Sequence, residues 1–172
     1  MSFGKRTLGL ATVAAVSLTL SLAQSPQRST AQAMRANFVG VNARILTMAK
    51  DFPADKYNFR LKPEMRSYGE VIVHVASGLV FAAKAGRGEK VNWDELNPKD
   101  YPNKAAAAAL MEKSIADANA TLKGVSDAAL DKSIEPWIDV MEHSAEHYGL
   151  LVAYYRANGI VPPESPPKEP KK

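Results

Sequence analysis

The feature of this 172-residue chain that most limits its fold is a helical repeat of apolar side chains. In four stretches of about twenty residues, apolar residues return at every third or fourth position, which places them on one face of an α-helix. The first stretch shows the repeat through Met34, Phe38, Val41, Ile45 and Met48. No stretch alternates apolar and polar residues as a half-buried strand does. The sequence therefore predicts an all-α four-helix bundle, either up-down-up-down or with a longer crossover.

Residues that favour the starts and ends of helices mark the limits of these stretches. Ser67 and Glu70 form a capping-box pattern at the start of the second helix, and Gly86 suits its end. Pro53 ends the first helix because the residue before a proline disfavours helical geometry. Pro136 suits the first turn of the last helix. The expected core stripe of that last helix consists of Trp137, Met141, Ala145, Tyr148, Val152 and Tyr155.

The first residues of the chain have the pattern of a targeting signal. Lys5 and Arg6 precede an uncharged apolar run, and Ser21-Leu22-Ala23 places small residues where a signal peptidase cleaves. This pattern predicts a secretory signal peptide over residues 1–23. We therefore expect export to the periplasm or the extracellular space, with no stable membrane anchor after cleavage. An uncleaved anchor helix is the alternative, although the run is short for a bilayer span.

The rest of the chain divides into a polar linker over residues 24–30, a helical bundle over 31–160 and a tail over 161–172. The tail is rich in proline and lysine, a composition that predicts an extended, disordered segment. The whole chain has 22 basic and 18 acidic residues, and the signal peptide contains two of the basic ones. The weak positive charge that remains, without a basic cluster in the bundle, does not support nucleic-acid binding.

The chain contains no cysteine. Disulfide bonds, thiolate metal ligands and a cysteine nucleophile are therefore excluded, and so is lipid attachment at a cysteine after the signal peptide. A bound metal ion would have to be held by histidine, carboxylate or water.

The three histidines of the chain are the candidate functional residues. His143 and His147 project to one side of the last helix, one turn apart, where two imidazoles can bind one cation. Counted at about 100° per residue from Trp137, the expected core stripe centres at roughly 30° and these histidines fall at about 240° and 280°. They lie on one flank of the stripe, either as ligands or as solvated polar residues. His74 lies among β-branched residues, either as a ligand or as a core histidine with satisfied nitrogens.

Two segments carry a resemblance to a known family. "RSYGEVIVHVASG" is followed later in the chain by "MEHSAEHYGLLVAYYRANGIVPP", and over residues 31–163 the chain resembles the DinB/YfiT-like superfamily of metalloenzymes. In that superfamily one histidine on the second helix and a His-x3-His pair on the fourth helix bind one divalent cation. The resemblance implies that His74, His143 and His147 are the ligands here. Dimers are common in the superfamily, so the resemblance also implies a homodimer.

Three neutral imidazoles suit Zn²⁺, Ni²⁺, Fe²⁺ or Co²⁺ better than Mg²⁺ or Ca²⁺, which prefer oxygen ligands. Three protein ligands leave a position for water or substrate, as in catalytic zinc sites. An acceptor on the second nitrogen usually orients a ligand histidine. Glu70, one turn before His74, and Asp139, one turn before His143, are candidates for that role or for a general base. A solvated surface acid is the alternative for both, and a helix cap is a further alternative for Glu70.

These patterns predict an exported protein that binds one divalent transition metal and acts as a hydrolase or transferase on a small molecule. The resemblance adds that the superfamily includes metal-dependent thiol transferases and isomerases that use low-molecular-weight thiols. A non-catalytic, metal-stabilised bundle that serves as a binding or interaction module is the alternative. A structural bundle without a metal is the third hypothesis.

Overall fold

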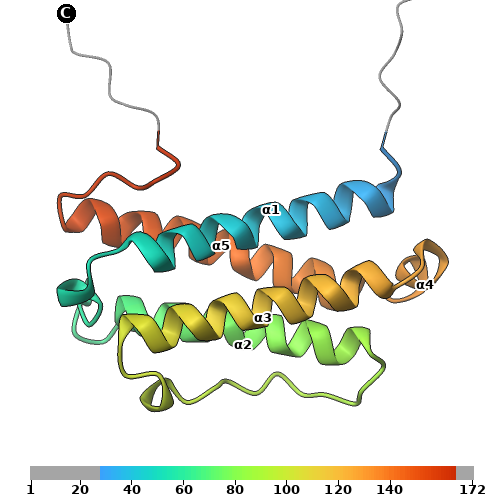
Figure 1. The fold of residues 1–172 in the computed structure, drawn as a ribbon, viewed down its shortest axis with the longest axis horizontal. Coiled ribbons are helices and arrows are strands. Elements are labelled where there is room, and N and C mark those ends of the chain that lie inside the picture. Colours follow the sequence, from blue (N-terminus) through green and yellow to red (C-terminus); the bar gives the residue numbers. More distant parts are fainter. Residues whose placement is uncertain (1–27, 166–172) are drawn as a thin grey trace, which may run out of the picture.

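The computed structural model of the protein describes residues 28–165, which form a bundle of four long helices and one short helix (Figure 1). The predicted signal peptide, residues 1–23, lies outside the described residues, as do most of the predicted linker and tail. The helices are α1 (Thr30–Asp51), α2 (Tyr68–Gly86), α3 (Lys104–Gly124), α4 (Asp127–Lys132) and α5 (Glu135–Ala157), with the 3-10 turns η1 (Ala54–Lys56) and η2 (Pro98–Asp100). Residues 28–165 contain no strand, so the all-α prediction is confirmed.

A long connection between α2 and α3 determines the order of the helices around the bundle. α2 packs against α3 and α5, and α1 packs against the same two helices, so α1 and α2 lie diagonally. Residues 87–103, which we call the crossover, return along the bundle, so that α2 and α3 run in the same direction and α1 and α5 run in the opposite one (Figure 1). The structure therefore has the topology with the longer crossover. As a consequence, α2 and α5, the two helices that carry histidines, are direct neighbours.

The start of α2 confirms the capping box predicted from the sequence. Oγ of Ser67 accepts a hydrogen bond from the amide of Glu70 at 3.3 Å, and the Glu70 carboxylate accepts one from the amide of Ser67 at 2.7 Å. These two bonds satisfy amides that the first helical turn cannot pair. α2 therefore begins where the sequence predicts, and its register fixes the direction of His74.

α2 is also the one helix in residues 28–165 that is long and apolar enough to span a membrane. Of its most apolar window, 61% is buried inside the bundle, so packing in the core accounts for its hydropathy. At one end Tyr68 stacks on Phe52, with ring centroids 3.8 Å apart. At the other end Gly86 lies directly against the buried ring of Trp137.

The buried face of α5 differs from the predicted one. Trp137 and Tyr155 are buried as predicted, but Ala145 is exposed. Three other predicted core residues are half-buried, namely Met141, Tyr148 and Val152. The buried positions that the prediction missed are Val140, Ser144, Leu151 and Tyr154. This corrected face is turned by roughly 70° toward the side of the helix that carries the histidines.

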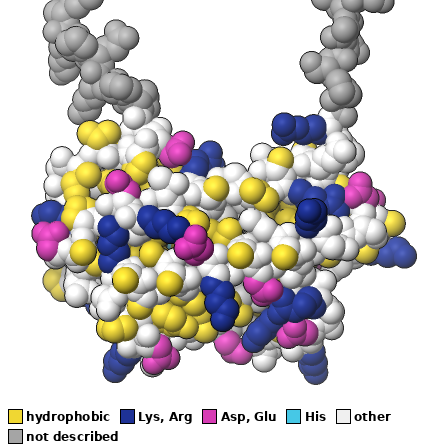
Figure 2. Space-filling model, viewed as in Figure 1, with side chains coloured by type: hydrophobic (Ala, Val, Ile, Leu, Met, Phe, Trp, Pro, Cys, Tyr) yellow, Lys and Arg dark blue, Asp and Glu magenta, His cyan; other side chains and the backbone are white. Residues whose placement is uncertain are grey.

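α1 and α3 form a face that carries hydrophobic side chains between charged ones and shows no histidine (Figure 2). A groove of about 830 Å³ lies between these helices, with Val39 and Gly40 among its lining residues. A Cβ atom added at Gly40 would meet nothing within 4 Å. This groove is separate from the histidines, which lie between α2 and α5.

Candidate metal centre

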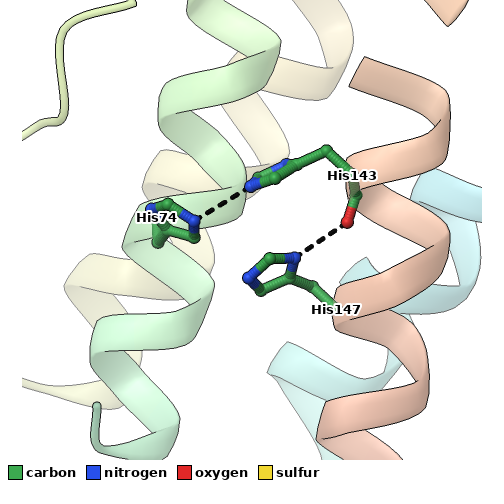
Figure 3. Close-up of side chains that lie close together, drawn as sticks. All are labelled: His74, His143 and His147. Carbon is green, nitrogen blue, oxygen red and sulfur yellow. Dashed lines mark hydrogen bonds between the residues drawn. The ribbon is translucent and has the colours of Figure 1, made fainter. Parts of the chain in front are cut away.

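The three histidines of the chain meet where α2 packs against α5. His74 comes from α2, and His143 and His147 come from successive turns of α5 (Figure 3). One ring nitrogen from each residue lies within 4.8 Å of the others, and all three residues are half-buried. The structure therefore brings together every histidine that the sequence singled out, in a cluster that could hold a metal ion.

A contact between two rings of this cluster joins His74 and His143, whose Nε2 atoms are 2.9 Å apart. Two unprotonated ring nitrogens would repel each other at this distance, so the contact requires a proton or a cation between them. Zn–N bonds of about 2.0–2.1 Å in a tetrahedral site place the ligand nitrogens roughly 3.3 Å apart. If the two nitrogens moved about 0.4 Å further apart, their distance would suit two ligands of one zinc ion.

A hydrogen bond within α5 orients the ring of His147. Its Nδ1 donates to the backbone carbonyl oxygen of His143 at 2.8 Å. With the proton on Nδ1, the neutral ring keeps its lone pair on Nε2, and this atom points toward α2 (Figure 3). The donor set fits a transition-metal ion, because one imidazole nitrogen from each of three histidines on two helices lies within 4.8 Å of the others.

The sequence model of the DinB superfamily matches residues 37–155 of the chain. The chain belongs to the DinB superfamily. The match begins within α1 and ends within α5, so it includes all three histidines. This confirms the family resemblance inferred from the two histidine segments. A comparison of this DinB-superfamily protein with curated proteins gives no match.

Neither of the two acids predicted to assist the histidines of this DinB-superfamily bundle forms a hydrogen bond with them in the described residues. One oxygen of Glu70 accepts from the amide of Ser67 at 2.7 Å, and the other accepts from Arg60 at 2.6 Å. The helix-capping alternative is therefore the correct one for Glu70. Asp139 is exposed on α5, and the described part of the chain provides it with no hydrogen bond or ion pair. Sequence proximity of one helical turn is therefore not sufficient to make an acid the hydrogen-bond partner of a histidine here.

Two residues of the crossover approach the histidines instead. Oε1 of Glu95 lies 3.1 Å from Nδ1 of His74, and the ring centroid of Trp93 lies 5.0 Å from that of His143. Gly78 permits this approach, because a Cβ atom there would lie 2.9 Å from the Trp93 ring and 3.3 Å from Nδ1 of His143. Sequence periodicity missed both crossover residues. The available signal was a tryptophan inside an otherwise polar connection.

The surroundings keep two of the rings neutral. The pKa of His143 is lowered to about 4, mainly by burial and further by the nearby His147, His74 and Arg66, against the opposing effect of Glu95. Burial is also the main cause that lowers the pKa of His74, followed by the charge of Arg66. Both rings are therefore neutral at pH 7, each with a proton on one nitrogen and a lone pair on the other, and this neutral form is the one that ligates metals.

Acid should destabilise the metal-free protein partly through His143. The pKa of this ring is about 4 in the folded state and about 6.5 in an unfolded chain. The unfolded state therefore binds more protons between these values, so the free energy of unfolding falls as the pH falls through that window. We expect this ring to contribute about 1 kcal/mol to that fall, after allowing for solvent screening.

Urea unfolding in the presence of chelator, at pH 7 and at pH 5, tests this expectation. The free energy of unfolding should fall less between the two pH values for His143→Gln than for the wild type. An equal loss in both would contradict the expectation.

Proposed function

We propose that this protein binds one divalent transition metal ion through His74, His143 and His147, and that it is an exported hydrolase or transferase of a small molecule. The observation that carries the proposal is the convergence of three ring nitrogens within 4.8 Å. The chain has only three histidines, and all of them belong to this cluster. Histidines that serve only as solvated polar residues have no reason to meet between two packed helices.

Zn²⁺, Ni²⁺ and Fe²⁺ are the ions that the donor set favours, because neutral imidazole binds them better than it binds Mg²⁺ or Ca²⁺. An ion with three protein ligands and an open position supplies Lewis-acid catalysis, which polarises a carbonyl group and lowers the pKa of water. The protein itself would hold this ion through His74 on α2 and the His143–His147 pair on α5. The ring of Trp93 lies edge-on against the ring of His143, with centroids 5.0 Å apart.

Export by a signal peptide over residues 1–23 is part of the same proposal. The basic residues, the apolar run and the small residues before Gln24 support it. Protein recovered from the periplasm or the medium should begin at Gln24 when its N-terminus is sequenced. A mature protein that still begins at Met1 would contradict cleavage.

A non-catalytic, metal-stabilised bundle is the second candidate function. The low solvent exposure of the site favours it. The His74 side chain is only 14% exposed, and a structural ion needs no access for substrate. A large fall in melting temperature on chelation, with no turnover of ester, amide or thiol substrates, would support this candidate. Turnover that is lost in His147→Ala would support the enzyme.

Metal content is the most direct test of the proposed site. Protein purified without a polyhistidine tag should contain about one equivalent of a transition metal by elemental analysis, since one set of ligands is present. The variant with all three histidines replaced by alanine should contain none, and Glu146→Gln, an exposed change on α5, should match the wild type. Full metal retention in the triple variant would overturn the proposal.

A further inference from the structure

The crossover is fixed to α2 on both sides of Glu95. Before it, the ring of Trp93 packs against Phe81 of α2, with centroids 5.1 Å apart, and against His143 of α5. After it, the amide of Leu96 donates to Oγ of the buried Ser77 at 3.0 Å. The backbone around Glu95 therefore has little freedom to move its side chain away from α2.

The two carboxylate oxygens of Glu95 have different partners. Oε1 lies 3.1 Å from Nδ1 of His74, and Oε2 accepts from Arg66 at 3.0 Å. Arg66 is in turn held to α5, because its backbone oxygen accepts a hydrogen bond from the hydroxyl of Tyr154. A carboxylate held in this way by an arginine keeps a fixed direction toward the imidazole.

The contact with Glu95 determines which nitrogen of His74 faces the other histidines. An ionised carboxylate only accepts hydrogen bonds, so Nδ1 of the neutral ring must carry the proton and Nε2 must carry the lone pair. Nε2 is the atom that lies 2.9 Å from His143. Glu95 therefore acts from the opposite edge of the ring, which excludes it as a fourth ligand in the observed arrangement.

We propose that Glu95 is a positioning residue of the metal centre, which selects the tautomer and direction of His74, and that Arg66 holds Glu95 in place. This inference rests on the proposed function, because it assigns Glu95 a role toward the metal that the three histidines would bind. The crossover thereby becomes a third structural element of the site, beside α2 and α5. Hydrogen-bond acceptors that orient a ligand histidine typically contribute about 10- to 100-fold to metal affinity.

Zinc affinity of the tag-free protein, measured by competition with a chromogenic chelator, tests the inference. Glu95→Ala should weaken zinc binding about 10- to 100-fold, and Glu95→Gln should weaken it less, because the amide oxygen can still accept from Nδ1. Asp139→Asn is the matched control, since this acid is exposed and one turn from a histidine, and it should bind zinc like the wild type. Glu70→Gln, which weakens the cap of α2, should lower the free energy of unfolding without a comparable loss of affinity.

A second readout does not depend on metal. In metal-free protein at pH 8, the ¹⁵N chemical shifts of the imidazole rings report which nitrogen of His74 carries the proton. The wild type and Asp139→Asn should show the Nδ1–H tautomer, and Glu95→Ala should show a mixture in which Nε2–H is substantial. This signature would not change if Glu95 only stabilised the fold.

The outcomes separate the two proposals. If the wild type binds no zinc, Ni²⁺ or Fe²⁺, the proposed function fails, whereas the tautomer of His74 still decides whether Glu95 orients the ring. If the wild type binds zinc and Glu95→Ala binds it with unchanged affinity, the positioning role is overturned and the proposed function stands. An unchanged His74 tautomer in Glu95→Ala would also overturn the positioning role.

Discussion

Replacing His143 with alanine is expected to weaken zinc binding by at least about 100-fold while the bundle remains folded. Nε2 of His143 lies 2.9 Å from Nε2 of His74. Loss of the His143 ring leaves two ligand nitrogens, one from His74 on α2 and one from His147 on α5. At a zinc concentration 100 times the wild-type dissociation constant, zinc should stabilise the wild type by about 2.7 kcal/mol. The variant should gain less than about 0.5 kcal/mol under the same conditions.

Urea unfolding with and without zinc measures this difference, and circular dichroism shows whether the variant is folded. Glu146→Gln is the matched control, because this acid lies in the same turn of α5 and is exposed. It should retain the full stabilisation by zinc. Equal stabilisation of His143→Ala and the wild type would show that zinc binds elsewhere.

The same substitution at two helical glycines is expected to change stability in opposite directions. A Cβ atom at Gly86 would overlap the ring of Trp137 and lie 3.0 Å from Cγ2 of Thr121. Trp137 is only 1% exposed and cannot move out of the core, so Gly86→Ala should cost about 1–3 kcal/mol or more through overpacking. A Cβ atom at Gly40 would enter the open groove between α1 and α3, so Gly40→Ala should gain about 0.5–1 kcal/mol from helix propensity.

Urea unfolding of the two metal-free variants beside the wild type tests this pair. The free energy of unfolding should fall for Gly86→Ala and rise for Gly40→Ala, with little change in the dependence on denaturant concentration. An unchanged free energy of unfolding in Gly86→Ala would contradict the close packing of α2 against Trp137. If Gly40→Ala were strongly destabilising, the groove would not be open at that position.

Local features of the chain could be predicted from the sequence because they depend on neighbouring residues. The capping box of Ser67 and Glu70 needs only a spacing of three residues and is present in the structure. The apolar stripe of α1, from Met34 to Met48, is buried as its period predicts. The two histidine segments were sufficient to infer the superfamily, because their motifs are also local.

The buried face of α5 could not be predicted from apolar residues alone. Ser144 lies in the centre of that face, where its hydroxyl donates to Oδ1 of the buried Asn42 at 2.9 Å. A polar residue whose hydrogen bond is satisfied can replace an apolar one in the core. The predicted stripe of apolar residues did not include this position and contained Ala145 instead, which is exposed.

The contacts of the crossover also could not be predicted from the sequence. Glu95 and Trp93 belong to a connection without helical period, so no register predicts where their side chains point. Glu70 and Asp139 had a predictable register, and for that reason they were selected as candidates. In the structure Glu70 caps α2 and Asp139 is exposed, whereas the acid that contacts a histidine, Glu95, lies 21 residues after His74.

The topology of the bundle also dictates when a newly made chain could acquire an ion. His74 and His143 are separated by 69 residues, and closing a loop of that length in an unfolded chain has a large entropic cost. A nascent chain has His74 long before the ribosome adds α5, and during that time it offers a single imidazole. Binding of the proposed ion would therefore accompany or follow folding, and a chain truncated before α5 would lack two of the three ligands. In this protein, the bound ion would mark a chain that is both complete and folded.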